Sequence, residues 1–385
     1  MSRFEKIIIA ITGASHLLVH AMMLSLPSLI LIIRKDYPAG LDIYGFAVSL
    51  SAFLFGLGAI PAGWLDRRFG GRNLLITYQI GSALSSIIIT IPSSFLGLII
   101  GLSLLGLFCS IYHPTGLTII SQNLKSVSKG MGLHAMFGSL GSAIGPLLAV
   151  SISLIFSWRA AYFLFAMLNI VMALVTLLTL SKSKLNINIK TKSNKKSNKR
   201  ALVYYFITNS FLGMAYYGFT TFMPIHLSLN TSSILAGLSE ELKAGIFPTI
   251  VFLSGMAGSF FGGKIGEKFD KRKSFSLIIF INIPILLILG VVTNEILVLA
   301  SIVLGIVYFS NQPIGNTLVA DFSDNRNRGL VYGMGFFISF GIGAFAAGIS
   351  GIVAESIGVH AVFPFMGVLL FPALVFSWLM FKASN

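Results

Sequence analysis

Long apolar segments recur twelve times along this chain, and they limit its fold more than any other sequence feature. A helix that crosses the hydrocarbon core of a bilayer needs about 20 apolar residues, which is the length of these segments. Backbone groups in lipid must be satisfied within helices or closed barrels, and barrel strands contain only about ten residues. The segments are therefore predicted to be helices, and Lys264 is the one charged residue within them. They span residues 7–33, 43–65, 73–91, 95–120, 130–155, 160–180, 201–224, 244–265, 274–292, 296–319, 330–353 and 358–381.

A low content of charged residues supports the same fold class. Only 10% of the 385 residues are charged and 55% are hydrophobic, whereas soluble globular proteins carry roughly 25% charged residues. A disordered chain is also excluded, because disorder requires low hydrophobicity and high charge. The one cysteine, Cys109, lies within an apolar segment, which excludes a disulfide framework and a cysteine metal cluster. We expect an all-α polytopic membrane protein with twelve transmembrane helices.

The basic residues are concentrated on one side of the predicted membrane. If the N-terminus is cytoplasmic, 23 of the 27 Lys and Arg residues fall in cytoplasmic regions, and only Arg34, Lys35, Arg159 and Lys243 fall outside. The positive-inside rule then predicts that both termini lie in the cytoplasm. The net charge of +15 is thus a topology signal and does not require a nucleic-acid partner. Abundant Lys, Asn and Ile hint at an AT-rich prokaryote, so we expect its cytoplasmic (inner) membrane.

The two halves of the chain repeat each other. Residues 63–72 match residues 263–272 at an offset of 200, and residues 113–116 match residues 312–315 at an offset of 199. A polar, Lys-rich segment separates the halves. We expect an N-terminal six-helix bundle at 1–180, a cytoplasmic linker at 181–200 and a C-terminal six-helix bundle at 201–385. A parallel six-plus-six repeat is typical of transporters, whose substrate site lies between the halves near the midplane.

The repeated basic loops carry a family resemblance. Together with the repeat and the linker, they resemble the major facilitator superfamily over the whole chain. The resemblance implies a twelve-helix transporter fold in which these loops pair with neighbouring helix ends and latch the cytoplasmic side. Arg67 stands where the family has an aspartate, and Asp66 lies one position earlier. The loop positions concerned are Gly63, Asp66, Arg67, Arg68, Gly70 and Arg72 in the first half, and Glu267, Lys268 and Arg272 in the second.

The fifth segment contains glycines and a proline that resemble the antiporter signature of the superfamily's exporters. These residues are Gly132, Gly141, Gly145 and Pro146. The resemblance implies export, although small residues also allow close helix packing without any such role. Residues 15–20, 112–121 and 157–161 are similar to the fosmidomycin-resistance-like branch of the superfamily.

Histidines are the candidate proton carriers, because all 12 acidic residues lie at predicted helix ends or in loops. His16 and His20 share one face of the first helix, and His113 lies in the fourth. Imidazole titrates near neutral pH, which suits reversible protonation, and ionisable groups within a membrane are usually functional. A structural role for each ring and a transition-metal site remain alternatives. His134 is interpreted as a packing or gating residue.

Polar and aromatic residues of the first, fourth, seventh and tenth helices are the candidate substrate contacts. No Lys or Arg reaches the middle of the membrane, so we expect a small amphipathic solute with little charge. With the three histidines, the candidates are Tyr112, Asn209, Tyr216, Tyr217, Tyr308, Asn311, Gln312 and Asn316.

These observations predict a secondary transporter that works by alternating access and exports a small organic solute in exchange for protons. We expect a monomer in the lipid bilayer that is not an enzyme and has no cofactor, no bound metal and no nucleic-acid partner. An importer of a small metabolite, or a transporter of a transition metal or metal chelate, is the alternative within the same class. A non-transporting membrane sensor or a polytopic membrane enzyme is the alternative from another class.

Overall fold

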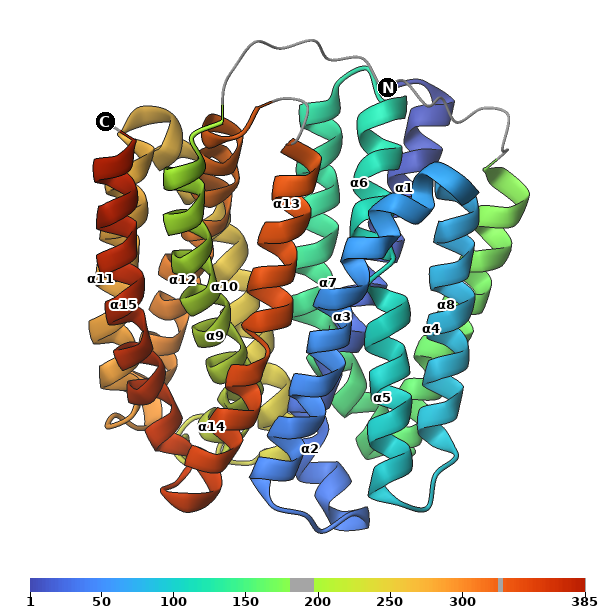
Figure 1. Ribbon diagram of the computed structural model, residues 1–385. Coiled ribbons are helices and arrows are strands. Elements are labelled where there is room, and N and C mark those ends of the chain that lie inside the picture. Colours follow the sequence, from blue (N-terminus) through green and yellow to red (C-terminus); the bar gives the residue numbers. More distant parts are fainter. Residues whose placement is uncertain (181–196, 325–327, 385) are drawn as a thin grey trace.

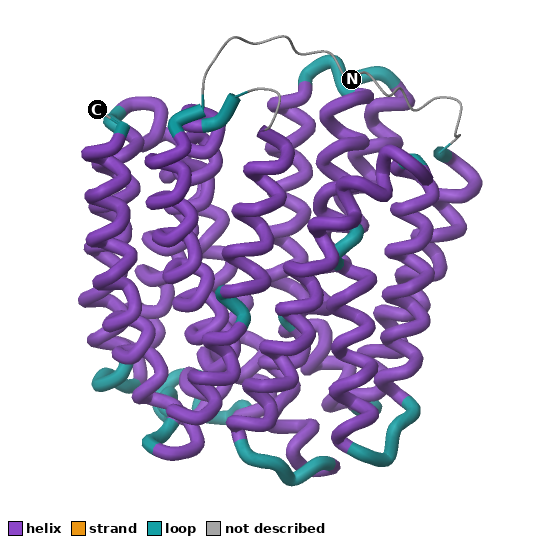
Figure 2. Tube along the Cα trace, viewed as in Figure 1, coloured by secondary structure: helices purple, strands orange, loops and turns teal. Residues whose placement is uncertain are grey.

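The computed structural model describes residues 1–180, 197–324 and 328–384, apart from the side chains at positions 63, 66, 67, 127–129, 328 and 329. Within these residues every regular element is a helix, as Figure 2 shows in purple. The helices form two upright bundles, α1–α8 and α9–α15, which stand side by side (Figure 1). Both termini lie at the same end, here called the terminal side, and the opposite end is called the far side.

The first bundle contains the six predicted segments, but two of them are broken. Pro27 and Pro114 explain the breaks, because a proline ring clashes with the carbonyl four residues earlier. One carbonyl belongs to Met23, the last residue of the helix Arg3–Met23. The other belongs to Ser110, directly after the helix Phe95–Cys109. The helices are α1 (Arg3–Met23), α2 (Ser25–Asp36), α3 (Leu41–Phe69), α4 (Gly71–Thr90), α5 (Phe95–Cys109), α6 (Tyr112–Asn123), α7 (Val127–Ile155) and α8 (Trp158–Thr179).

The second bundle starts two residues earlier than predicted. Lys199 and Arg200 were assigned to the linker but already belong to a helix, while residues 181–196 of that linker lie outside the described residues. The predicted eleventh helix is also interrupted, by a π-helical turn. The elements are α9 (Lys199–Leu229), α10 (Glu240–Lys268), α11 (Lys271–Leu289), α12 (Asn294–Phe322), α13 (Arg328–Phe336), η2 (Phe337–Ile342), α14 (Phe345–Ser356), η3 (Val359–Ala361) and α15 (Val362–Ala383).

Among the described residues, eleven helical segments are long and apolar enough to cross a membrane. The helix α9 completes the set of twelve; it has 31 residues, but tyrosines, hydroxyl side chains and an asparagine lower its mean hydropathy. The predicted fold class, an all-α protein with twelve membrane helices in two six-helix repeats, is therefore confirmed.

The basic loops on the terminal side pair with neighbouring helix ends, each within its own bundle. The Arg72 guanidinium donates to the backbone carbonyls of Leu180 and, at 2.9 Å, of Leu177, at the end of α8. Arg272 donates to the carbonyl of Ser384 at 3.2 Å, at the end of α15. It also hydrogen-bonds the Asp270 carboxylate, which lowers the pKa of that carboxyl to about 2. In this conformation these hydrogen bonds brace each bundle internally.

The bundles contact each other through polar bonds toward the far side. Lys35 Nζ lies 2.6 Å from Glu241 Oε1, and the Glu355 carboxylate accepts from the backbone N–H of Leu41 at 2.7 Å. The Ser49 hydroxyl donates to the carbonyl of Ala344 at 2.5 Å and accepts from the N–H of Gly348 at 2.8 Å. Thr249 donates to the carbonyl of Ala143 at 2.6 Å. All hydrogen bonds and ion pairs between described residues of the two bundles belong to this set, so this conformation is closed on the far side.

Candidate functional site

The three predicted site histidines, His16, His20 and His113, meet in the first bundle, where α1 packs against α6. Nε2 of His20 lies 3.1 Å from Nε2 of His16, one helical turn earlier. The ring of His113 stands edge-on to both, with centroids 4.9 Å from His16 and 5.5 Å from His20. Ring nitrogens of the three residues lie within 4.8 Å of one another, close enough to share a single bound cation.

Two prolines place these rings at the ends of helices rather than within continuous ones. His20 lies four residues before the break at Leu24, and His113 is the second residue of α6, directly after the break at Ser110 and Ile111. Each break follows from the proline that stands three or four residues further along the chain. The sequence therefore brings the histidines to mid-bundle positions where the helices change direction.

A fourth histidine, on α7, completes the cluster. The ring of His134 stacks on that of His16 with centroids 4.0 Å apart and an interplanar angle of 13°. Its backbone carbonyl accepts a hydrogen bond from Nδ1 of His16 at 2.8 Å. The sequence analysis interprets His134 as a packing or gating residue. The structure places it in direct contact with the predicted site.

Tyr112 joins the same cluster through its hydroxyl group. That hydroxyl donates to the backbone carbonyl of Thr12 in α1 and lies 3.2 Å from Nδ1 of His134. The ring of Tyr112 is buried, as is that of Tyr78, which donates to the carbonyl of Ser15 at 3.0 Å. These phenols anchor α4 and α6 to the backbone of α1, and they hold the histidines in place.

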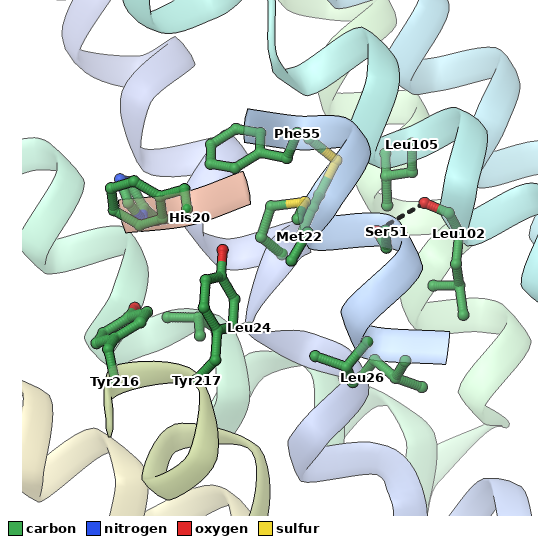
Figure 3. A pocket seen from close by; sticks show the side chains of 14 residues that line it. His20, Met22, Leu24, Leu26, Ser51, Phe55, Leu102, Leu105, Tyr216 and Tyr217 are labelled. Atoms are coloured by element: carbon green, nitrogen blue, oxygen red, sulfur yellow. Dashed lines mark hydrogen bonds between the residues drawn. The ribbon is translucent and has the colours of Figure 1, made fainter. Parts of the chain in front are cut away.

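An aromatic wall of the second bundle faces the cluster. The ring of Phe336 lies 4.8 Å from His113, and Phe340 packs on Tyr216 at 6.0 Å. Tyr216 and Tyr217 extend from α9 into a cavity that His20 lines from the opposite bundle (Figure 3).

This cavity is small, with a volume of about 30 Å³, which holds no more than about two water molecules. Its lining contains no Lys, Arg, Asp or Glu.

The remaining predicted contacts of the second bundle do not converge on the histidines. Asn209 donates to the carbonyl of Gly335 at 3.1 Å, and Tyr308 donates to the carbonyl of Leu212 at 2.5 Å, so both have structural partners. Asn311 is buried, and neither of its amide atoms has a partner among the described residues.

Two further candidates point away from the core. The side chains of Gln312 and Asn316 are exposed. Asn316 contributes its backbone carbonyl to Tyr332 at 2.9 Å.

The glycines of the fifth predicted helix have two different surroundings. A side chain at Gly141 or Gly145 would collide with the backbone of Leu17 or Ala21 in α1, whereas Gly132 faces open space. Pro146 lies within α7 next to Gly145. Close packing of α1 and α7 therefore explains two of the three motif glycines. Among the predicted loop residues, the side chains of Gly63, Asp66 and Arg67 lie outside the described residues.

Sequence comparison decides the family. The profile of the Major Facilitator Superfamily matches residues 12–333 and 228–385, which together cover nearly the whole chain. The chain belongs to the major facilitator superfamily. As a major facilitator protein it is a multi-pass secondary transporter of a small molecule and not an enzyme.

Its major facilitator relatives and fold neighbours are distant. The multidrug resistance protein MdtG of Proteus mirabilis is 25% identical over 89% of this chain and 86% of its own length. A probable chloroplastic anion transporter of Arabidopsis thaliana is 29% identical, but this chain spans only 24% of its length. The crystal structure of a bacterial homologue of the lysosomal transporter Spinster, inward-facing and occupied, superimposes with a TM-score of 0.82 at 15% identity, over 100% of this chain and 98% of the other.

Proposed function

We propose that this major facilitator protein exports a small aromatic or amphipathic solute with little charge, in exchange for protons. The histidine cluster carries the proposal, because its rings are titratable and two of them, His20 and His113, face the second bundle. The cavity that His20 lines contains no charged residue, so a neutral aromatic solute suits its walls better than an ion does.

The distribution of basic residues supports a cytoplasmic location for the terminal side. The far-side bonds then close the protein toward the exterior. Exchange requires that these bonds break while the terminal sides of the bundles approach each other. A proton bound at the histidines changes the charge of the junction, and it therefore biases which of the two conformations is favoured.

Three observations support export and the finer classification. The relative from Proteus mirabilis is named a multidrug resistance protein, and it matches most of this chain. The helix α7, which is the fifth predicted segment, carries the glycine pattern that resembles the exporter signature. The motifs at 15–20 and 112–121 favour the fosmidomycin-resistance-like branch. We assign 1–180 and 199–385 to the two moving domains and 181–198 to the cytoplasmic linker of a monomer in a prokaryotic inner membrane.

Everted membrane vesicles test direction and coupling together. Vesicles with an acidified interior and trapped pyranine are offered a panel of neutral aromatic amphiphiles that begins with chloramphenicol. Export in exchange for protons predicts solute accumulation with a simultaneous rise of internal pH, absent from vesicles without the protein. Accumulation in right-side-out vesicles instead would indicate import, and accumulation without proton movement would contradict the proposed coupling.

The metal alternative has its own measurement. The three histidine nitrogens that lie within 4.8 Å of one another are compatible with a transition-metal ion. Elemental analysis of the purified protein, with His113→Ala as the comparison, is expected to find no stoichiometric metal. A metal ion present in the wild type and lost in the variant would replace the proton proposal with metal or chelate transport.

A further inference from the structure

His134 is a buried histidine without a role in the exchange described so far. Its side chain is 3% exposed, and it lies against His16 in the middle of the first bundle. The inference drawn below rests on the proposed function, since it assigns His134 to the same proton site.

The direction of two hydrogen bonds fixes which nitrogen of His134 carries the proton. A phenol has one hydrogen, and Tyr112 donates it to the carbonyl of Thr12, which only accepts. Nδ1 of His134, 3.2 Å from the Tyr112 oxygen, must then be the donor in their contact. A neutral imidazole carries a single ring proton. Nε2 of His134 is therefore left with a free lone pair, and it has no hydrogen-bond partner among the described residues.

The same reasoning fixes the tautomers of His16 and His20. Nδ1 of His16 faces the carbonyl of His134 at 2.8 Å, so this nitrogen carries the proton and Nε2 is the acceptor. Nε2 of His20, 3.1 Å away, must donate to it. The neutral cluster thus has free lone pairs at Nδ1 of His20 and at Nε2 of His134, and Nε2 of His113 is likewise buried and unpartnered.

The surroundings allow the cluster only one positive charge. The groups that face His134 and its neighbours are His16 and His20 of α1, Tyr112 and His113 of α6, and Tyr78 of α4. None of them is a carboxylate. Two imidazolium rings with centroids 4.0–5.5 Å apart would repel each other strongly in a buried site without a counter-ion.

We infer that His134 is the fourth proton-accepting member of the cluster, through its free Nε2, and that the four rings share one proton. A proton that binds at Nε2 of His134 converts this ring to imidazolium with both nitrogens protonated. A proton that binds at Nδ1 of His20 instead lets the Nε2 proton of His20 move along the 3.1 Å bond to His16. His20 is then neutral with its proton on Nδ1, and His16 carries the charge.

Solid-state NMR of the ¹⁵N-histidine-labelled protein in lipid bilayers tests the inference without any solute. At about pH 8 we expect His134 to carry its proton on Nδ1, and as the pH is lowered we expect the doubly protonated fractions of the four rings to rise to a sum of about one and no further. The His134→Gln spectrum assigns the signal. The matched control is His226, whose Nε2 donates to the carbonyl of Leu289 at 2.8 Å and whose Nδ1 accepts from Asn230 at 3.2 Å. It should show the opposite tautomer.

A second variant separates the tautomer argument from folding. Tyr112→Phe removes the acceptor for Nδ1 of His134, so both tautomers of this ring are expected to appear while the signal of His226 stays unchanged. A proton on Nε2 of His134 in the wild type, or two protons per cluster, would overturn the inference. If His16 and His20 gain a proton while His134 never does, the inference fails and the proposed function stands. If no ring gains a proton, the proposed function fails with it.

Discussion

Nε2 of His20 lies 3.1 Å from Nε2 of His16, and this contact joins two titratable rings one turn apart on a single helix. The backbone carbonyl of His134 on α7 accepts a hydrogen bond from Nδ1 of His16 and holds that ring in place. The two facing nitrogens already share the Nε2 hydrogen of His20, and a proton that enters at Nδ1 of His20 is passed to His16 through this contact. The pair therefore behaves as one proton site, and removal of either ring should remove that site.

Loss of either ring is expected to uncouple transport from protons. His16→Gln and His20→Gln should reduce pH-driven accumulation of the best solute of the panel by roughly 5- to 150-fold, the usual range of an energetic coupling between two sites. Solute exchange without a pH gradient should change far less. His226→Gln, which removes a buried histidine near the far side, is the matched control and should behave as the wild type. Full coupling in both variants would exclude these histidines as the proton carriers.

Gly138 of α7 provides the space for the ring of His16. A methyl group at this position would lie 2.6 Å from Nε2 of His16, well inside van der Waals contact. Gly138→Ala should therefore displace the ring and weaken coupling, at a cost in stability of about 1–3 kcal/mol. Gly132→Ala is the control on the same helix, because a methyl group there meets open space. Melting temperature in detergent and pH-driven transport measure the two effects, and equal behaviour of both variants would contradict the prediction.

The far-side bonds should contribute unequally to closure. The Lys35–Glu241 ion pair is largely exposed on its lysine, so Glu241→Ala should cost at most about 1 kcal/mol. Glu355 caps the first N–H of α3 from the other bundle, and Glu355→Ala should cost about 0.5–2 kcal/mol. Spin labels at Ala39→Cys and Ala236→Cys, in a Cys109→Ser background, report the separation of the bundles.

We expect a larger fraction of molecules with the bundles separated on the far side in Glu355→Ala than in Glu241→Ala. The control is Glu240→Ala, which removes the charge next to Glu241 without removing an ion pair between described residues. An unchanged distance distribution in both test variants would show that closure rests on apolar packing alone.

Arg72 should stabilise the first bundle more than its neighbour Arg68. The Arg72 guanidinium donates to two carbonyls at the end of α8, whereas Arg68 is exposed and lies over the ring of Phe69 at 5.5 Å. A hydrogen bond to a charged group contributes roughly 1.5–3 kcal/mol. Arg72→Ala should therefore lower the melting temperature in detergent clearly, and Arg68→Ala should lower it little. A larger loss in Arg68→Ala would overturn the role given to Arg72.

Much of the fold could be predicted because each membrane span is a local feature. About 20 apolar residues satisfy their own backbone hydrogen bonds as a helix, so the spans can be recognised without knowledge of their neighbours. The interruptions of the helices could not be predicted in the same way. Pro27 and Pro114 break their helices, whereas Pro224 and Pro313 occupy the matching positions of the repeat within continuous helices. A proline in the sequence therefore does not by itself determine whether its helix is interrupted.

The candidate site shows the same division. His16 and His20 could be paired from sequence, because residues four apart share a helix face. Placing His113 beside them required the packing of α6 on α1, and finding His134 required the packing of α7. The sequence also could not predict that Gln312 and Asn316 are exposed, since a helix in a membrane has polar residues on more than one face.

The sequence by itself determined the number of spans, the internal repeat, the family and the shortage of charge in the membrane. These properties depend on composition and on spacing along one helix. Only the tertiary structure decided that four histidines from three helices meet, that Gly138 leaves room for one of them, and that the bundles close on the far side. Contacts between helices depend on how their surfaces fit together, and no local pattern in the chain encodes that fit.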